Sequence, residues 1–184
     1  MSGTVIDALT FWARSKPDLE AIDFDGDVVT YSELARWADG VASNLEERGV
    51  KPGDRVSFVG KNSLEWCVAA LGAMKVGAIA APFNQRMLVA ELTALVEDCV
   101  PTVIICDDEL RSRLMEVKAA HDTFELLGFE SDVAPLRSKA NAAYVTPIRE
   151  LADPTAIVFT SGTTGRPKGV IFTHATIAGE MHEW

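Results

Sequence analysis

The residues of this sequence that could do chemistry are concentrated in one run of ten, residues 160–169. The run reads Thr-Ser-Gly-Thr-Thr-Gly-Arg-Pro-Lys-Gly. Gly162 and Gly165 permit positive φ and leave backbone N–H groups unobstructed, and successive N–H groups in such a turn form a concave nest for anions. Lys168 adds a mobile positive charge, and further hydrogen-bond donors come from the hydroxyls of Thr160, Ser161, Thr163 and Thr164. Together these parts suit a polyphosphate.

Other phosphate-binding patterns fit this run poorly. A Walker A loop needs Gly, four residues and then Gly-Lys-[Ser/Thr], but Pro167 stands five positions after Gly162, and Gly169 follows Lys168. The dinucleotide fingerprint Gly-x-Gly-x-x-Gly is missing too. A kinase-like phosphotransferase is therefore disfavoured. The remaining alternative is a hairpin loop rich in Gly, Ser and Thr with a solvated lysine, and the density of hydroxyls beside Lys168 argues against it.

Two short apolar runs flank this segment and are expected to position it. Residues 156–160 and residues 169–173 each predict a buried strand, so the segment would be the loop between two strands. Upstream, residues 129–151 show no helix or strand period and consist of polar residues and small apolar ones. We expect a surface connection there.

Before that connection, strand and helix periodicities alternate along the chain. Helix 63–76 is apolar nearly all round and is expected to be deeply buried. Such βαβα alternation implies a parallel sheet flanked by helices. The expected fold class is therefore α/β, a mostly parallel sheet flanked by helices, with a phosphate-binding hairpin loop near the C-terminal end. Strands are expected at 55–59, 78–81, 102–106 and 124–128, and further helices at 88–99, where Leu88 belongs to the apolar stripe, and at 108–120.

The N-terminal part predicts a helix, a hairpin and a second helix. Residues 5–15 are amphipathic and precede Pro17, and Asp25-Gly26 between two apolar runs is a hairpin signal. Thr30 and Glu33 can form a capping box. The helix that it opens ends near Gly49 and places on one face Leu34, Trp37, Ala38, Val41 and Leu45.

Composition and charge bound the function further. The 184 residues are 48% hydrophobic and 24% charged, which describes an ordinary globular domain. With 17 Lys and Arg against 27 Asp and Glu, the net charge of −10 speaks against a nucleic-acid partner and against anionic membrane surfaces. We expect no integral membrane segment and a cytoplasmic location, because no secretory signal opens the sequence and no apolar stretch is long enough to span a bilayer. Buried free thiols are expected at Cys67, Cys99 and Cys106.

Three regions of the sequence resemble one known family. Residues 160–169 look like the phosphate-loop signature of the AMP-forming adenylating superfamily, which includes acyl-CoA and aryl-CoA synthetases and the adenylation domains of peptide synthetases. Residues 30–34 with 49–56 resemble that family's first core motif, and residues 73–82 resemble its second. The run Pro82-Phe-Asn-Gln-Arg86 is similar to the acyl/aryl-CoA synthetases rather than to the peptide-synthetase branch. The resemblance spans residues 4–174.

The resemblance implies an ATP-dependent ligase. Members activate a carboxylic acid as an acyl-adenylate and then transfer it to a thiol, usually coenzyme A. It implies that Lys168 is catalytic and neutralises the leaving pyrophosphate, and that Thr160 anchors the start of the loop. The β- and γ-phosphates of ATP would be bound by Ser161, Thr163 and Thr164, and loop closure would be allowed by Gly162, Gly165 and Gly169.

The same resemblance implies that much of the catalytic machinery lies elsewhere. In the family, the adenine pocket, the Mg²⁺-binding Glu, the ribose-binding Asp and the lid-domain Lys all follow the phosphate loop. Residues 1–184 are thus expected to be the N-terminal part of an AMP-binding domain, truncated after that loop and without the C-terminal lid domain. We expect little or no activity from it alone, and exposed apolar surface through which it could form a homodimer. The alternatives are a free-standing nucleotide-binding or partner-binding module derived from such a ligase, and an adenylation domain of another branch of the superfamily. The acid substrate cannot be read from this sequence.

Other conspicuous residues carry weaker predictions. His174 would start a helix or contact substrate, and Arg86 is assigned no chemistry. Asp107, Asp108 and Glu109 read as an acidic first helical turn rather than as metal ligands, and no metal site is expected. Surface positions are expected for His121 and His182, and core positions for Trp12, Trp37 and Trp66.

Overall fold

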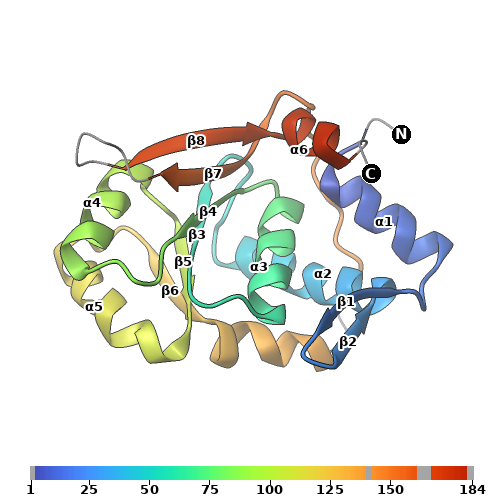
Figure 1. The fold of residues 1–184 in the computed structure, drawn as a ribbon, viewed down its shortest axis with the longest axis horizontal. Coiled ribbons are helices and arrows are strands. Elements are labelled where there is room, and N and C mark those ends of the chain that lie inside the picture. The colour runs from blue at the N-terminus through green and yellow to red at the C-terminus, as the bar shows by residue number, and fades with distance from the viewer. Residues whose placement is uncertain (1–2, 140–141, 161–166, 182–184) are drawn as a thin grey trace.

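A mixed sheet organises the chain. The computed structural model describes residues 3–139, 142–160 and 167–181. Within these ranges the larger sheet has six strands in the order β6-β5-β3-β4-β7-β8 (Figure 1). All neighbours are parallel except β7 and β8, so the expected mostly parallel α/β fold is confirmed. The strands are β3 (Arg55–Val59), β4 (Ile79–Phe83), β5 (Val103–Cys106), β6 (Glu125–Gly128), β7 (Pro154–Thr160) and β8 (Lys168–Thr173).

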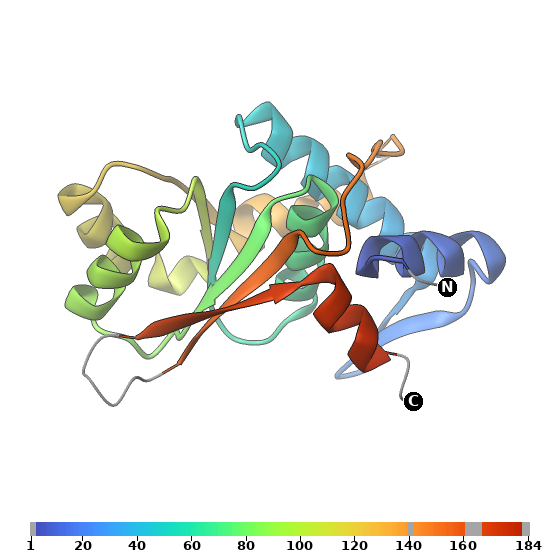
Figure 2. The same cartoon turned by 90° about the horizontal axis from the view of Figure 1, so that it is seen from above.

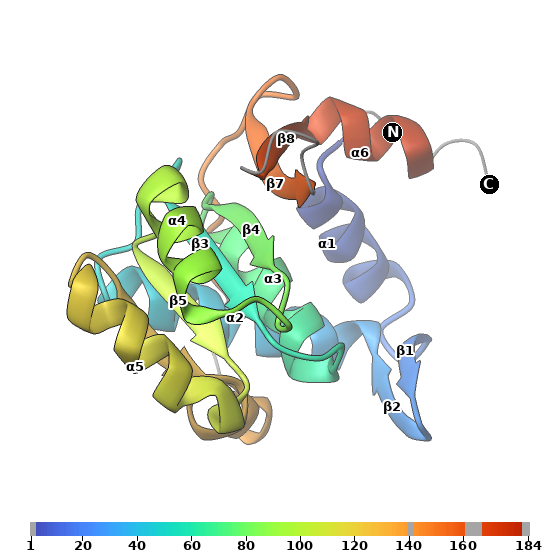
Figure 3. The same cartoon turned by 60° about the vertical axis from the view of Figure 1, so that its left-hand side comes forward.

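Helices cover both faces of the parallel part of this sheet (Figure 3). Because successive strand side chains point to opposite faces, Phe58 packs into the core beneath one helical layer and Val59 into the core beneath the other. The first layer is formed by α2 (Tyr31–Glu47) and α3 (Leu64–Lys75), and the second by α4 (Val89–Cys99) and α5 (Arg111–Ala120).

Helix α3 is apolar on nearly every side because it lies between the sheet and α2. Gly72 lets the two helices approach closely: a Cβ at this position would lie 2.4 Å from Cγ1 of Val41. The deep burial expected of this helix is confirmed, and it extends to Lys75, which is only 5% exposed.

The N-terminal elements follow their predicted signals. Helix α1 (Val5–Ser15) precedes an antiparallel hairpin of β1 (Glu20–Phe24) and β2 (Asp27–Thr30). The hairpin turns at Asp25 and Gly26, which have φ of 53° and 86°. The capping box at the start of α2 is present, since the Glu33 amide donates to the Thr30 hydroxyl and the Thr30 amide donates to the Glu33 carboxylate.

The surface connection expected over residues 129–151 is wrong for its first ten residues. They form one π-helical turn, η2 (Phe129–Val133), and a 3₁₀ segment, η3 (Ala134–Ser138), which pack beneath α2 and α3. Phe129, Val133 and Leu136 are buried, and the Trp37 indole N–H donates to the Val133 carbonyl at 3.0 Å. The usual apolar pattern is absent because neither turn has the α-helical period: the π turn has i→i+5 hydrogen bonds and the 3₁₀ turn has i→i+3 hydrogen bonds.

Smaller corrections concern helix starts and aromatic side chains. Leu88 precedes α4 instead of joining its apolar stripe and is 70% exposed. The helix expected over 108–120 begins with a 3₁₀ turn, η1 (Asp108–Leu110), before α5. Trp37 is fully buried, whereas Trp12 and Trp66 are half-buried and lie against Tyr31 and Phe58.

Candidate phosphate-binding site

The two ends of the expected phosphate loop are held by the β7–β8 hairpin. Thr160 is the last residue of β7 and Lys168 the first of β8, and the two face each other in the antiparallel register. The Thr160 hydroxyl also donates to the Lys168 carbonyl at 3.4 Å. The remaining predicted site residues lie outside the described ranges: Ser161, Gly162, Thr163, Thr164 and Gly165.

The hairpin is attached to the sheet through β7, by strand pairing far from the loop and by an aromatic contact near the loop. Ala156 of β7 pairs with Ala80 of β4, and the Phe159 ring packs edge-on against Phe83 with centroids 5.5 Å apart. From that attachment the two strands extend past α4 (Figure 2). The loop ends therefore stand on a stiff pair of strands at the margin of the domain.

The expectation that both strands are buried is wrong. Val158 is 41% exposed, Val170 45% and Ile171 60%. The cause is topological, because β8 is an edge strand and β7 has a single registered pair with β4. The apolar runs in these two strands have the sequence pattern of buried strands. Within the described ranges, however, one face of the hairpin is not covered by any other element.

Gly169 has a packing role that differs from the expected loop flexibility. It lies inside β8, opposite Phe159. A Cβ at this position would come within 2.8 Å of Cγ2 of Ile157 and 3.3 Å of the Phe159 ring. Glycine is therefore required for the close approach of the two strands immediately beside Lys168.

His174 and Thr173 fix the other end of β8. His174 is 3% exposed, begins α6 (His174–Met181), and donates its backbone N–H to the Asp153 carbonyl at 3.1 Å. The Thr173 hydroxyl accepts from the Thr176 amide at 3.2 Å, as an N-cap does. Burial lowers the pKa of His174, and the nearby charge of Arg149 lowers it further. This buried position supports the helix-start role that we considered for His174.

A hollow of about 390 Å³ lies beside the hairpin, on the α4 side of the sheet. Ile157, Phe159 and Ile171 form its apolar wall, with Arg55 and Asp98 at its polar edge. The Arg55 guanidinium is already engaged there: its Nε donates to the Cys99 carbonyl at 2.8 Å and its Nη2 to the Val100 carbonyl at 2.6 Å. Arg55 thus caps the end of α4, and its donors are not aimed at the loop.

The acidic run after β5 has a structural role. The Asp107 carboxylate accepts the Lys61 backbone N–H at 3.0 Å, and Lys61 Nζ pairs with Glu109 at 2.7 Å. These contacts tie together the ends of β3 and β5. Burial raises the pKa of Asp107, whereas the Lys61 ammonium lowers the pKa of Glu109. A search of the described residues finds no group of three His, Cys, Asp or Glu that could hold a metal ion.

The other minor candidates stay away from the loop. Arg86 is exposed on the connection before α4, and His121 is half-buried and pairs with Glu97 at 3.0 Å. His182 lies outside the described residues. Cys99 and Cys106 are buried free thiols as expected, with burial raising the pKa of Cys106 to about 12, while Cys67 is half-buried.

The described part of the site can therefore offer one cation at the mouth of a loop. Lys168 is exposed, and within the described ranges no carboxylate pairs with it. An exposed ammonium held by a rigid strand pair suits an anion that enters from solvent. None of the helices in these ranges is long and apolar enough to cross a membrane.

Comparison with known proteins identifies the fold and the family. The chain is 32% identical, over 193 residues, to the fatty acid–[acyl-carrier-protein] ligase ScoC of Streptomyces coeruleorubidus, with 98% of this chain and 36% of the relative covered. It is 33% identical, over 180 residues, to the long-chain-fatty-acid–CoA ligase FadD13 of Mycobacterium tuberculosis, covering 94% of this chain and 35% of that one. The structure of ATP-bound MatB from Rhodopseudomonas palustris superimposes with a TM-score of 0.81 at 31% identity, over 94% of this chain and 36% of MatB.

The chain is much shorter than these relatives but matches one family along most of its length. It spans about a third of the length of each. The family model described as "AMP-binding enzyme" matches residues 9–184. The N-terminal subdomain architecture of adenylating enzymes agrees with the sheet and hairpin described above. The chain belongs to the AMP-binding enzyme family.

Proposed function

We propose that this chain is the N-terminal portion of an ATP-dependent, AMP-forming acid–thiol ligase. The observation that carries the proposal is the β7–β8 hairpin, which holds Thr160 and Lys168 opposite each other at the two ends of a hydroxyl-rich and glycine-rich loop. The family match and the ATP-bound relative support ATP as its nucleotide. The substrate class is a carboxylic acid, as the fatty-acid ligases among the relatives suggest.

The proposed reaction has two steps. A carboxylate oxygen attacks the α-phosphorus of ATP, the bond from that phosphorus to the bridging oxygen breaks, and pyrophosphate leaves. A thiol then attacks the acyl carbon, loses its proton, and displaces AMP. The first step accumulates negative charge on the pyrophosphate, which fixed donors and a cation stabilise.

The need to stabilise the negative charge on the pyrophosphate suggests a role for each of these residues. Lys168, exposed at the start of β8, would neutralise the leaving pyrophosphate, and Thr160 would anchor the loop through its contact with the Lys168 carbonyl. We propose β- and γ-phosphate binding by Ser161, Thr163 and Thr164, with Gly162 and Gly165 leaving their N–H groups accessible.

The thiol acceptor is proposed to be coenzyme A, in line with the relative described as a long-chain-fatty-acid–CoA ligase. The relative described as a fatty acid–[acyl-carrier-protein] ligase supports a carrier-protein thiol as the alternative. We propose a role in fatty acid metabolism with either acceptor, and a cytoplasmic location. We propose that Mg²⁺ accompanies ATP. Among the described residues no group of three His, Cys, Asp or Glu could hold a metal ion, so we name no ligand for it there.

We further propose that the 184-residue chain binds ATP but does not complete the ligation, because the chain spans about a third of its relatives. The uncovered apolar hairpin face, with Val158 and Val170, would favour a homodimer. A monodisperse monomer in light scattering at high concentration would contradict the homodimer.

Acid-dependent ATP–pyrophosphate exchange by this chain, run beside an equilibrium titration with ATP, tests the proposal. We expect saturable ATP binding and no exchange above background with any carboxylic acid. Robust exchange would overturn the claim of incompleteness. Absence of ATP binding would overturn the assignment of a working phosphate loop.

A further inference from the structure

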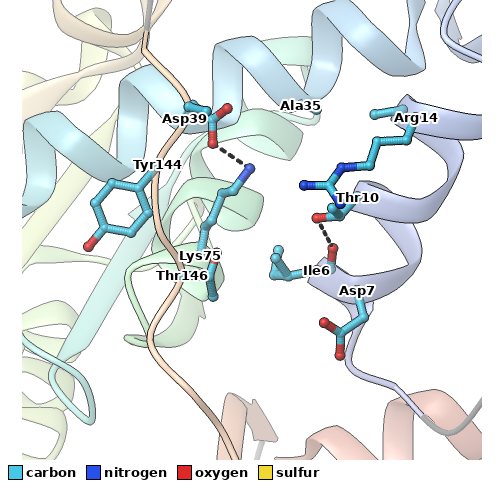
Figure 4. A pocket seen from close by; sticks show the side chains of 11 residues that line it. Ile6, Asp7, Thr10, Arg14, Ala35, Asp39, Lys75, Tyr144 and Thr146 are labelled. Carbon is cyan, nitrogen blue, oxygen red and sulfur yellow. Dashed lines mark hydrogen bonds and ion pairs between the residues drawn. The ribbon is translucent and has the colours of Figure 1, made fainter.

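A cavity of about 360 Å³ lies between α1 and the first helical layer (Figure 4). Its walls come from α1, α2 and α3 and from the segment at residues 143–146, and no residue of β7 or β8 lines it. It is therefore separate from the candidate phosphate-binding site. Its volume is at the lower end of the range for pockets that take small molecules.

The cavity is lined by two cations, Lys75 and Arg14, and by two carboxylates, Asp39 and Asp7. Lys75 pairs with Asp39, and both side chains are buried. An ammonium has three N–H donors, so the pair with Asp39 leaves donor capacity unused. From the opposite wall the Arg14 side chain extends from α1 into the cavity toward this pair (Figure 4). Among the described residues Arg14 has no ion-pair or hydrogen-bond partner, so its guanidinium is a charge in the cavity that no carboxylate pairs with.

Three of the other polar groups around the cavity, those of Asp7, Thr10 and Tyr144, already have hydrogen-bond partners. The Asp7 carboxylate accepts the Thr4 amide at 2.7 Å and the Thr4 hydroxyl at 3.0 Å. The Thr10 hydroxyl donates to the Ile6 carbonyl at 2.8 Å. The Tyr144 hydroxyl points out of the cavity and donates to Glu46 at 3.0 Å (Figure 4). Apolar surface makes up much of the remaining wall, from Ile6, Ala13, Ala35 and Ala143.

We propose that this cavity binds a small aliphatic monocarboxylate. Its carboxylate would lie between Arg14 and Lys75, where a guanidinium can donate two parallel hydrogen bonds and the ammonium a third. Its short chain would contact the alanine side of the cavity. One carboxylate group matches the unpaired Arg14 guanidinium. Inorganic phosphate has no apolar part to fill the alanine side of the cavity, and the Asp7 carboxylate on the wall disfavours a second negative charge on the ligand. The ligand would bridge α1 to α2 and α3.

Isothermal titration of the 184-residue chain with butyrate, butyramide and inorganic phosphate tests this site. We expect saturable binding of butyrate, no binding of butyramide, and a rise in Tm at saturating butyrate because the ligand binds the folded state. Arg14→Gln should weaken butyrate binding about tenfold or more, since it removes charge-assisted hydrogen bonds. Ala13→Leu should block binding by filling the cavity while leaving every charge in place.

Arg86→Gln is the matched control, because it removes another exposed arginine from the connection before α4, on the far side of the molecule from α1 (Figure 1). It should leave butyrate affinity unchanged, and added ATP should not compete with butyrate. Equal butyrate affinity in Arg14→Gln and wild type, or no butyrate binding by the wild type, would overturn the site. Butyramide or phosphate binding as tightly as butyrate would overturn the monocarboxylate assignment.

Discussion

Thr160 and Lys168 stand opposite each other across the β7–β8 pair, and the threonine hydroxyl donates to the lysine carbonyl at 3.4 Å. The register thus closes the loop that we propose binds phosphate at a defined pair of residues. It also places the Lys168 side chain at the mouth of the loop, where its charge is exposed to solvent. Strand pairing, rather than a helix N-terminus, is what supports the site.

Gly169→Ala should disturb this pairing. The added methyl group would lie 2.8 Å from Cγ2 of Ile157, so the Ile157 side chain or one of the two strands must shift. Overpacking of this kind costs about 1–3 kcal/mol of the free energy of unfolding. Urea unfolding measures the change.

Gly179→Ala is the control for that substitution, because Gly179 lies in α6 and a Cβ there meets no atom within 4 Å. Alanine should be neutral or stabilise the helix by up to about 1 kcal/mol. If the two alanine variants had the same stability, the packing role of Gly169 would be refuted.

Lys75→Met should destabilise the fold strongly. The substitution leaves the Asp39 carboxylate buried without its cation, and breaking such a buried pair costs about 3–5 kcal/mol. The double variant Lys75→Met/Asp39→Leu should recover much of that loss, because it removes both charges together. Chemical denaturation of the two variants makes the comparison, and a loss below about 1 kcal/mol in the single variant would show that the pair behaves like an exposed one.

His174 should make stability sensitive to mild acid. Burial and Arg149 lower its folded-state pKa, while Asp153 and Asp7 oppose that shift. Because the unfolded chain keeps an ordinary pKa near about 6.5, the unfolded state binds the proton more readily. The contribution is fully present above about pH 6.5 and is lost as the pH falls through the lower, folded-state pKa.

The variant His174→Gln isolates the contribution of His174 to the pH dependence of stability. Between about pH 7 and pH 5 its free energy of unfolding should fall less than that of the wild type, since other groups titrate equally in both proteins. Parallel pH profiles in the two proteins would contradict the assignment of His174 as a buried neutral group.

Much of the fold could be predicted from local signals. The capping box at Thr30, the turn at Asp25 and Gly26 and the all-round apolar character of residues 64–75 each depend on short-range sequence, and each is present in the structure. Parallel strands buried on both faces also give uninterrupted apolar runs, as in Val103–Cys106.

Predictions from the sequence were wrong where tertiary contacts override the local pattern. Residues 129–138 bury only Phe129, Val133 and Leu136, and a spacing set by π-helical and 3₁₀ turns resembles an irregular connection. Val170 and Ile171 read as core residues, but strand order makes β8 an edge, which local sequence does not encode. The packing role of Gly169 was missed too, since it depends on the register with β7.

The central claim is that the loop between β7 and β8 binds the phosphates of ATP through Lys168. Equilibrium titration of ATP against the wild type, Lys168→Ala and the control Lys51→Ala tests it most directly, because Lys51 lies in the exposed turn before β3 and carries the same charge. We predict about tenfold or weaker affinity in Lys168→Ala and wild-type affinity in Lys51→Ala. Equal ATP affinity in all three proteins would contradict the account.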